Sequence, residues 1–441
     1  MDRMLVDLLA CPLTGSRLEP WSAHDGEEIS YGVLRSDAAE YPVVAGIPVM
    51  FPDFEEVVAL VRAGRHDDAL LHMVVHDIPR GGAGRVLDAF ASIRTTQPVA
   101  SRVLQRDDQR RHRDACQALA DRTPGSLLRF EYLDSAARSV DAYDYFSLRA
   151  ATPRYLVALS CIEAVPEGDS PILDVGCGPG HVTWALCERV RPRPVIGIDA
   201  SFLMVLTARR DTSPRGAFVC GDATALPFAD GAFGAALAAD VLTFIDRRRT
   251  AVTELDRVLG PRGWCAMTSL HSARARYTYT HRPVPIGAWR RLAAGFAHGV
   301  VPDDAVVQRY REGLGLPGGR GHEARSCDDT SRITMVMARD ESDLDDRGPF
   351  ADWPHGRGAL QVNPLYEEAG RTAAGRVYQR RFPSEVFRID NAPLADYMPE
   401  QAVVSDAALR AVSENRQTDE VRALLASFVV LGAPGPPWLR R

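Results

Sequence analysis

The stretch of residues 171–200 constrains the fold more than any other part of the chain. It begins with a short apolar run that ends in a turn containing Gly176, Gly178 and Gly180. A helix-length segment with apolar residues on one face follows, and then a second apolar run that ends at Asp199. This pattern predicts a strand, a glycine loop, a helix and a second strand. Such alternation continues to about residue 270 and predicts a parallel sheet with helices on both faces.

The glycines predict a ligand that approaches the main chain. Without Cβ atoms the chain can turn sharply out of the strand, and the next helix presents unpaired N–H groups nearby. Asp199 follows Gly176 by 23 residues, close to the roughly 20 expected for a carboxylate that binds ribose hydroxyls. A small molecule containing a ribose is therefore the expected ligand. His181 stands where the dinucleotide fingerprint needs a small residue, which disfavours a nicotinamide cofactor.

Four sequence blocks, in order, resemble the class I S-adenosylmethionine-dependent methyltransferases. The first is the D-x-G-x-G-x-G pattern of residues 174–180, and the others are residues 221–228, 233–240 and 254–263. The resemblance implies an α/β fold with a Rossmann-like seven-stranded sheet and helices on both faces. It also implies S-adenosyl-L-methionine as the cofactor.

The resemblance assigns cofactor-binding roles to seven residues. The methionine and ribose side of the cofactor would be lined by Gly176, Gly178 and Gly180. Asp174 would hold the amino group and Asp199 the ribose. The adenine would contact Asp222 and Ala223. The residues alone leave other roles open. Gly176 and Gly178 also suit an ordinary turn, and Asp222 is also a suitable helix N-cap. His181 is either a residue at the start of a helix beside the cofactor or a catalyst.

The candidates for a general base are Asp240 and His271, which end the predicted fourth and fifth strands. Ligands of such sheets lie beyond the carboxyl ends of the strands, so both side chains are expected to face the methyl acceptor. A histidine with a pKa near 6.5 suits proton removal from a hydroxyl acceptor. Packing or positioning is the alternative role for His271, because methyl transfer needs a base only when the acceptor loses a proton.

Composition excludes several functions. The 441 residues carry a net charge of −6, so the chain lacks the positive charge that is typical of proteins that bind nucleic acids. All 52 basic residues are arginine, so Schiff-base chemistry, pyridoxal phosphate attachment and a P-loop lysine are excluded. No apolar run is long enough to span a membrane and no secretory leader is evident, so a cytoplasmic protein is expected.

Residues 1–52 are expected to form a small α+β module that resembles the Trm112 type. Cys11 is the only cysteine before Cys116, so a four-ligand zinc site cannot be built there and no metal is expected. A metal-free module that docks on a partner surface is one interpretation, and a small β-rich cap that only packs is the other.

The rest of the chain divides into three predicted regions. Residues 53–134 are a helical insert or linker, residues 135–275 the S-adenosylmethionine-binding core, and residues 276–441 a helical and loop extension that includes the last sheet strands and binds or covers the acceptor. The aromatic residues of the helices before the first core strand line either the acceptor pocket or the core; they are Tyr143, Tyr145, Phe146 and Tyr155.

Together these features predict a methyltransferase for a small-molecule acceptor, with oxygen slightly favoured as the methylated atom and secondary metabolism as one setting. A homo-oligomer is left open. Two alternatives stay open: a cofactor-binding scaffold that partners another enzyme, and an enzyme that uses S-adenosylmethionine for a reaction other than methyl transfer.

Overall fold

The computed structural model describes residues 1–22, 28–76, 97–134, 139–274, 284–317, 327 and 330–434. The predicted boundary between core and C-terminal region, at residues 275 and 276, lies outside the described residues. No helix in these ranges is long and apolar enough to cross a membrane.

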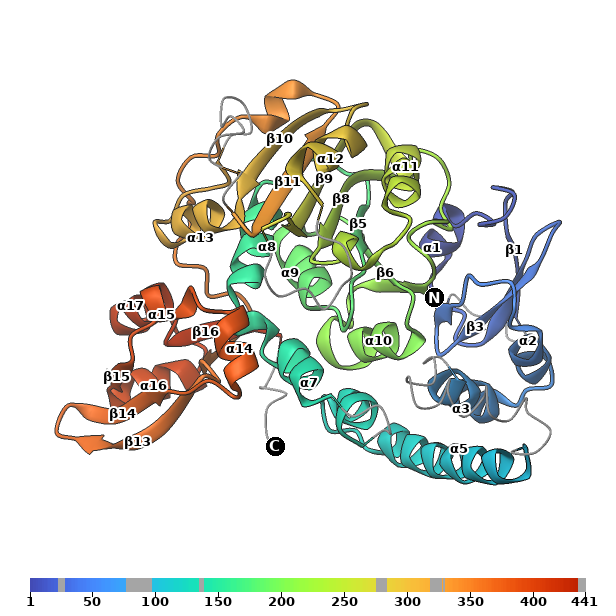
Figure 1. Ribbon diagram of the computed structural model, residues 1–441, viewed down its shortest axis with the longest axis horizontal. Helices are drawn as coiled ribbons and strands as arrows, with labels where there is room; N and C mark the ends of the chain where they lie inside the picture. Colours follow the sequence, from blue (N-terminus) through green and yellow to red (C-terminus); the bar gives the residue numbers. More distant parts are fainter. Residues whose placement is uncertain are drawn as a thin grey trace.

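A seven-stranded sheet forms the centre of the molecule and confirms the predicted fold (Figure 1). In spatial order its strands are β10 (Ala297–Pro302), β11 (Arg332–Ala338), β9 (Leu259–His271), β8 (Phe233–Ala239), β5 (Ile172–Val175), β6 (Val195–Asp199) and β7 (Ala217–Cys220). The five strands from β5 to β9 run parallel, whereas β11 is antiparallel to both of its neighbours. The two strands at this edge of the sheet, β10 and β11, follow the other five in the sequence.

Helices cover both faces of this sheet because successive strand residues point to opposite sides. In β5, Ile172 packs with α8 (Pro153–Glu163), α9 (His181–Arg189) and α13 (Asp303–Arg311). The next residue, Leu173, packs on the other side with α11 (Arg248–Val258) and α12 (Ile286–Leu292). The buried strands consist mainly of apolar residues, as expected for a parallel sheet that is covered on both faces.

The N-terminal unit, residues 1–50, contains α1 (Arg3–Leu8) and an antiparallel sheet of β1 (Glu19–Trp21), β2 (Gly32–Arg35), β3 (Glu40–Val44) and β4 (Ile47–Pro48). It docks on the edge strand β7: the Met50 N–H donates to the Cys220 carbonyl at 2.7 Å. A second contact joins the Ala10 N–H to the Pro227 carbonyl at 2.9 Å. Leu5 and Tyr41 are buried in one core with the central sheet. This unit therefore contacts its own chain's methyltransferase-like core.

The region between these two parts is helical. Its helices are α2 (Glu55–Arg62), α3 (His66–His76), the long α5 (Gln97–Ala120), α6 (Ser126–Arg129), a π-helical turn (Phe130–Asp134) and α7 (Val140–Ser147). In Figure 1 they follow one side of the molecule and lead back to the first core strand through α7 and α8. The path brings the end of this region to the glycine loop.

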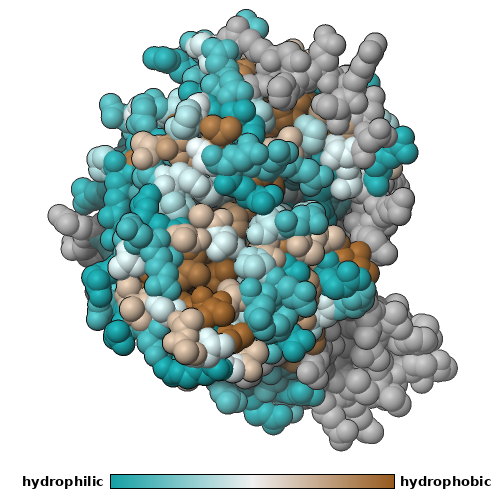
Figure 2. All heavy atoms as spheres, turned by 90° about the vertical axis from the view of Figure 1, so that its left-hand side faces the viewer, coloured by the Kyte–Doolittle hydropathy of each residue, from teal (hydrophilic) through white to brown (hydrophobic). Residues whose placement is uncertain are grey.

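The C-terminal unit, residues 350–434, contains strands as well as the expected helices and loops. Strand β12 (Ala359–Val362) pairs with β16 (Val430–Ala433), and β13 (Tyr366–Thr372), β14 (Gly375–Arg380) and β15 (Gln401–Val404) form a second small sheet. The helices are α14 (Glu385–Asp390), α15 (Leu394–Tyr397), α16 (Asp406–Ser413) and α17 (Asp419–Ala426). Buried residues of this unit share a core with α8 and α9. The side of the molecule on which this unit lies is mostly hydrophilic with a hydrophobic area near its centre (Figure 2).

Candidate functional site

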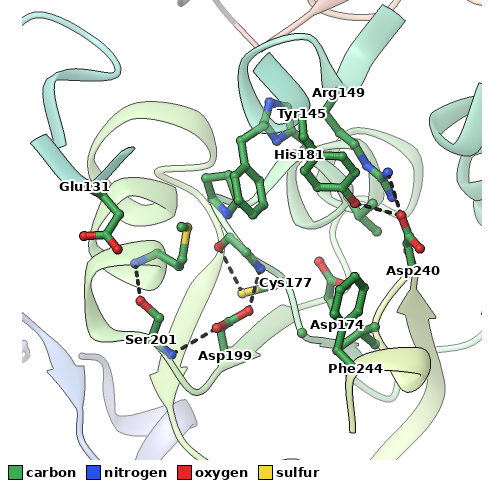
Figure 3. Close-up of a pocket in the computed structure, with 18 of the residues that line it drawn as sticks. Glu131, Tyr145, Arg149, Asp174, Cys177, His181, Asp199, Ser201, Asp240 and Phe244 are labelled. Atoms are coloured by element: carbon green, nitrogen blue, oxygen red, sulfur yellow. Dashed lines mark hydrogen bonds and ion pairs between the residues drawn. The ribbon is translucent and has the colours of Figure 1, made fainter. Parts of the chain in front are cut away.

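A cavity of about 400 Å³ opens at the carboxyl ends of β5, β6 and β8. The glycine loop after β5, the end of β6 and the end of β8 form one side of it, and residues from α7 and the turns around it form the other (Figure 3). Parallel strands present their carboxyl ends at one edge of a sheet, which is where α/β proteins bind ligands. The cavity therefore lies at the edge of the sheet where a ligand of this fold is expected.

The glycine loop has backbone angles that would strain a residue with a side chain. Gly176, Gly178 and Gly180 have φ angles of +65°, +50° and +86°, a region that side chains disfavour. A Cβ on Gly176 would also lie 2.2 Å from Cγ2 of Val241, whereas one on Gly178 would meet nothing closer than 3.5 Å. Gly176 and Gly178 line the cavity, and Gly180 is the residue before α9. The loop thus brings the main chain to the cavity surface.

Asp199 braces this loop from the end of β6. Its Oδ2 accepts a hydrogen bond from the Gly178 N–H at 2.9 Å, and its Oδ1 accepts one from the Ser201 N–H at 3.0 Å. Both bonds are visible in Figure 3, where the carboxylate faces the cavity. The strand end and the glycine loop are therefore fixed to each other by one side chain.

Asp174 is the most deeply buried acid of the cavity. Its Oδ2 accepts from Oγ1 of Thr183 at 2.6 Å. Burial raises the pKa of Asp174 to about 7, and the charge of Asp199 contributes to the rise. A positively charged ligand group would favour the ionised form, because an opposite charge offsets the cost of burying a carboxylate.

Asp240, at the end of β8, is held by donors from the helices. Its Oδ2 accepts from the Tyr145 hydroxyl at 2.8 Å and from Nη1 of Arg149 at 3.3 Å. Burial would raise the pKa of Asp240, but the charges of Arg154 and Arg149 outweigh that effect, so its pKa is lowered. Asp240 is therefore a stable carboxylate at the cavity wall and a weak proton acceptor.

The helical side of the cavity contains a residue that the sequence analysis did not single out, Arg149. Tyr145 and Phe146 line the cavity, whereas Tyr143 and Tyr155 lie in the core. The Arg149 guanidinium lies 5.1 Å from the centre of the Tyr145 ring. Arg149 follows Tyr145 by four residues but lies beyond the end of α7, in a short 3-10 turn (Arg149–Ala151), so helix periodicity did not point to it.

Two histidines occupy different positions. His181 lines the cavity, and burial, with a smaller effect from Arg149, lowers its pKa to about 3, so its imidazole is neutral. His271, a predicted general base, is buried but lies outside the cavity lining. Its carbonyl accepts from Nε1 of Trp289 at 3.1 Å, and its Nδ1 has no hydrogen-bond partner among the described residues. Burial lowers the pKa of His271 as well.

Asp222 and Ala223, the predicted adenine contacts, are not brought into the cavity lining. Asp222 is exposed, and its Oδ1 accepts from the Thr224 N–H at 2.7 Å. Within the ranges that the structure describes, no group of three or more His, Cys, Asp or Glu residues is placed to hold a metal ion. In the N-terminal unit, Sγ of Cys11 lies 3.2 Å from the Tyr41 hydroxyl.

Comparisons with known proteins relate the central part of the chain to methyltransferases. Residues 173–267 match the family described as methyltransferase domain. The chain is 39% identical over 104 residues to demethylmenaquinone methyltransferase of Thermus thermophilus, covering 23% of this chain and 47% of that protein. It is 31% identical over 191 residues to malonyl-[acyl-carrier protein] O-methyltransferase of Halorhodospira halophila, covering 40% and 64%. The solved structure of YcgJ from Bacillus subtilis is 19% identical with a TM-score of 0.31, covering 42% of this chain and 97% of that one.

The chain spans less than two thirds of the length of either curated relative. The match covers the strands that carry the glycine loop, Asp199 and Asp240. The centre of this chain is therefore a methyltransferase domain of the class I S-adenosylmethionine-dependent type.

Proposed function

We propose that the whole protein transfers a methyl group from S-adenosylmethionine to an oxygen atom of a small-molecule acceptor. The observation that carries this proposal is the convergence of the glycine loop, Asp174 and Asp199 on one cavity within the matched segment. S-adenosylmethionine supplies an activated methyl group on a positively charged sulfonium. The protein's part is then mainly to bind and orient, because positioning provides much of the rate of such a displacement.

The charges around the cavity suit the amino-acid end of this cofactor. Asp174 is a buried carboxyl group whose pKa is raised by burial, and the charge of Arg149 offsets only a small part of that rise. Arg149 lines the same cavity, has a side chain only 6% exposed, and donates a hydrogen bond to Asp240. An ammonium group beside Asp174 and a carboxylate beside Arg149 would each gain a charge-assisted hydrogen bond. Asp199 would then accept hydrogen bonds from the ribose hydroxyls.

Asp174 would be occupied by the ammonium group, and the weak basicity of two other lining residues, Asp240 and His181, favours an acceptor oxygen that is already anionic. Asp240 has a lowered pKa and His181 one of about 3, so neither takes up a proton readily near pH 7. A carboxylate oxygen attacks a methyl group without losing a proton, so no general base is required. The name of one relative, a malonyl-[acyl-carrier protein] O-methyltransferase, is in keeping with an oxygen acceptor. His271 and Asp240 then serve as packing and positioning groups.

The N-terminal unit, which resembles the Trm112 type in sequence, would act as a built-in support for the methyltransferase domain. The hydrogen bond from Met50 to Cys220 extends the sheet beyond its edge strand. Leu5 and Tyr41 are buried in the core that this unit shares with the central sheet. Such a contact covers an edge that would otherwise be exposed.

Calorimetric titration with S-adenosylmethionine and S-adenosylhomocysteine tests the proposal. We expect micromolar binding to the wild type and a loss of at least tenfold in affinity for Asp199→Ala. Asp121→Ala is the matched control, because Asp121 also accepts a backbone N–H, from Thr123 at 2.8 Å, but is exposed and lies outside the cavity. Asp222→Ala should leave the affinity unchanged if the adenine does not reach that side chain.

Activity is then sought by incubating the wild type with cell extract and methyl-labelled S-adenosylmethionine, and by searching for products that gain one methyl group. A wild type that binds neither ligand would refute the proposal and favour a scaffold. Binding that consumes the cofactor without a methylated product would favour a different reaction of the sulfonium.

A further inference from the structure

A buried chain of charged side chains connects the C-terminal unit to the cavity. Arg154, at the start of α8, contacts two carboxylates: its Nε lies 3.6 Å from Oδ2 of Asp240, and its Nη2 forms an ion pair with Oδ2 of Asp390. Asp390 ends α14 in the C-terminal unit. Its other oxygen, Oδ1, lies 2.5 Å from Nη2 of Arg332 on β11. Residues far apart in the sequence therefore meet behind the cavity wall.

The charges of this cluster are not evenly matched. Three guanidinium groups, of Arg149, Arg154 and Arg332, share two carboxylates, Asp240 and Asp390. The side chains of Arg149 and Arg154 are each 6% exposed, and that of Asp390 is 17% exposed. Buried charges are costly unless they are paired. Removal of the Asp390 charge would leave Arg154 dependent on Asp240 alone.

Asp240 is poorly placed to satisfy Arg154 by itself. The same Oδ2 atom already accepts from Tyr145 and Arg149. The backbone of Asp240 also has a φ of +60°, which is costly for a residue with a side chain and persists only when its surroundings fix it. The position of Asp240 therefore depends on how the surrounding arginines are held.

We propose that Asp390 is a positioning residue of the active site: by holding Arg154, it fixes Asp240 and the Tyr145 side of the cavity. The C-terminal unit is then part of the machinery that shapes the site. This inference rests on the proposed function, because cofactor binding is its readout. It adds a residue outside the segment that matches the methyltransferase family.

The test compares Asp390→Asn with Arg357→Gln. Arg357 also lies in the C-terminal unit and pairs with α8, but through Glu163 at the far end of that helix, nine residues and about 13 Å from Arg154. Arg357→Gln removes one ion pair between the C-terminal unit and the rest of the protein, whereas Asp390→Asn removes two, with Arg154 and with Arg332. Only Asp390→Asn disturbs the contacts of Asp240.

We expect both variants to lower the melting temperature, and only Asp390→Asn to change ligand binding. Its Kd for S-adenosylmethionine should rise about tenfold, the effect of losing one partly buried charge interaction. Its Kd for S-adenosylhomocysteine should rise less, because the thioether is neutral and the cluster has become more positive. Asp390→Glu, which keeps the charge, should restore most of the binding.

Arg332→Gln provides a second measurement if Asp390→Asn does not fold. It removes a positive charge from the same cluster, so it should shift the preference between the two ligands in the opposite direction, toward S-adenosylmethionine. Unchanged ligand preference in a folded Asp390→Asn or in Arg332→Gln would overturn the inference, as would an equal change in Arg357→Gln. A wild type that binds neither ligand would instead overturn the proposed function.

Discussion

Asp174→Asn should stabilise the ligand-free protein while abolishing its binding of the cofactor. Burial raises the pKa of Asp174 to about 7 from the 3.8 of an unperturbed aspartate. The folded state thus holds the Asp174 proton more tightly than the unfolded state, and ionisation of this group costs stability as the pH rises from about 4 to about 7. The full difference corresponds to about 4 kcal/mol of unfolding free energy. Asparagine keeps an oxygen for the Thr183 hydroxyl and never ionises.

The assay is urea denaturation of wild type and variant at several pH values. The variant's advantage in unfolding free energy should be about 2 kcal/mol at pH 5 and about 4 kcal/mol at pH 8. Asp303→Asn is the matched control. Asp303 is also buried, its pKa is raised to about 6 by burial, and it accepts from Ser269 and Thr334 away from the cavity.

Asp303→Asn should gain less, about 3 kcal/mol at pH 8, and keep its affinity for S-adenosylhomocysteine. Asp174→Asn should lose that affinity, because an amide offers no charge to an ammonium group. A stability gap that stays constant between pH 5 and pH 8 would refute the assignment of a buried, ionising Asp174. A variant that is less stable than wild type at pH 8 would do the same.

Three further perturbations follow from the site and the fold. Gly176→Ala should cost about 1 to 3 kcal/mol of stability and abolish S-adenosylhomocysteine binding in calorimetry, because both its φ and its surroundings exclude a Cβ. Gly178→Ala has room for the Cβ but keeps the backbone strain, so this variant should bind more weakly but measurably. Equal affinities of the two variants would contradict the geometry. Asp199→Asn should retain part of the loop's hydrogen bonding and lose about tenfold in affinity, less than Asp199→Ala. Met50→Pro removes the N–H that donates to Cys220. It should lower the melting temperature by several degrees without changing the Kd of the folded protein for S-adenosylhomocysteine. An unchanged melting temperature would show that this edge contact contributes little to stability.

The central sheet and its glycine loop could be predicted because their determinants are local. Strand, turn and helix succeed one another within 30 residues, and the apolar runs mark the buried strands directly. Asp199 was identifiable for the same reason, since its place at a strand end follows from the pattern. The roles assigned to the individual site residues remain predictions until ligand binding is measured.

Other features depend on packing that no local pattern records. The ion pair between Arg154 and Asp390 joins residues 236 positions apart. Strand β13 was missed because six of its seven residues are exposed, so its sequence lacks the apolar alternation of a half-buried strand. Asp222 follows its strand as predicted, but the turn directs its carboxylate to the Thr224 N–H.

The docking of the N-terminal unit on β7 sets an order of events during synthesis. Met50 leaves the ribosome 170 residues before its partner Cys220. At about 5 to 20 residues per second, the first unit waits roughly 10 to 30 s for the strand that it covers. During that interval Leu5 and Tyr41 lack the part of their core that the central sheet supplies. Once β7 is made, its outer edge can pair with a segment of the same chain that was synthesised first.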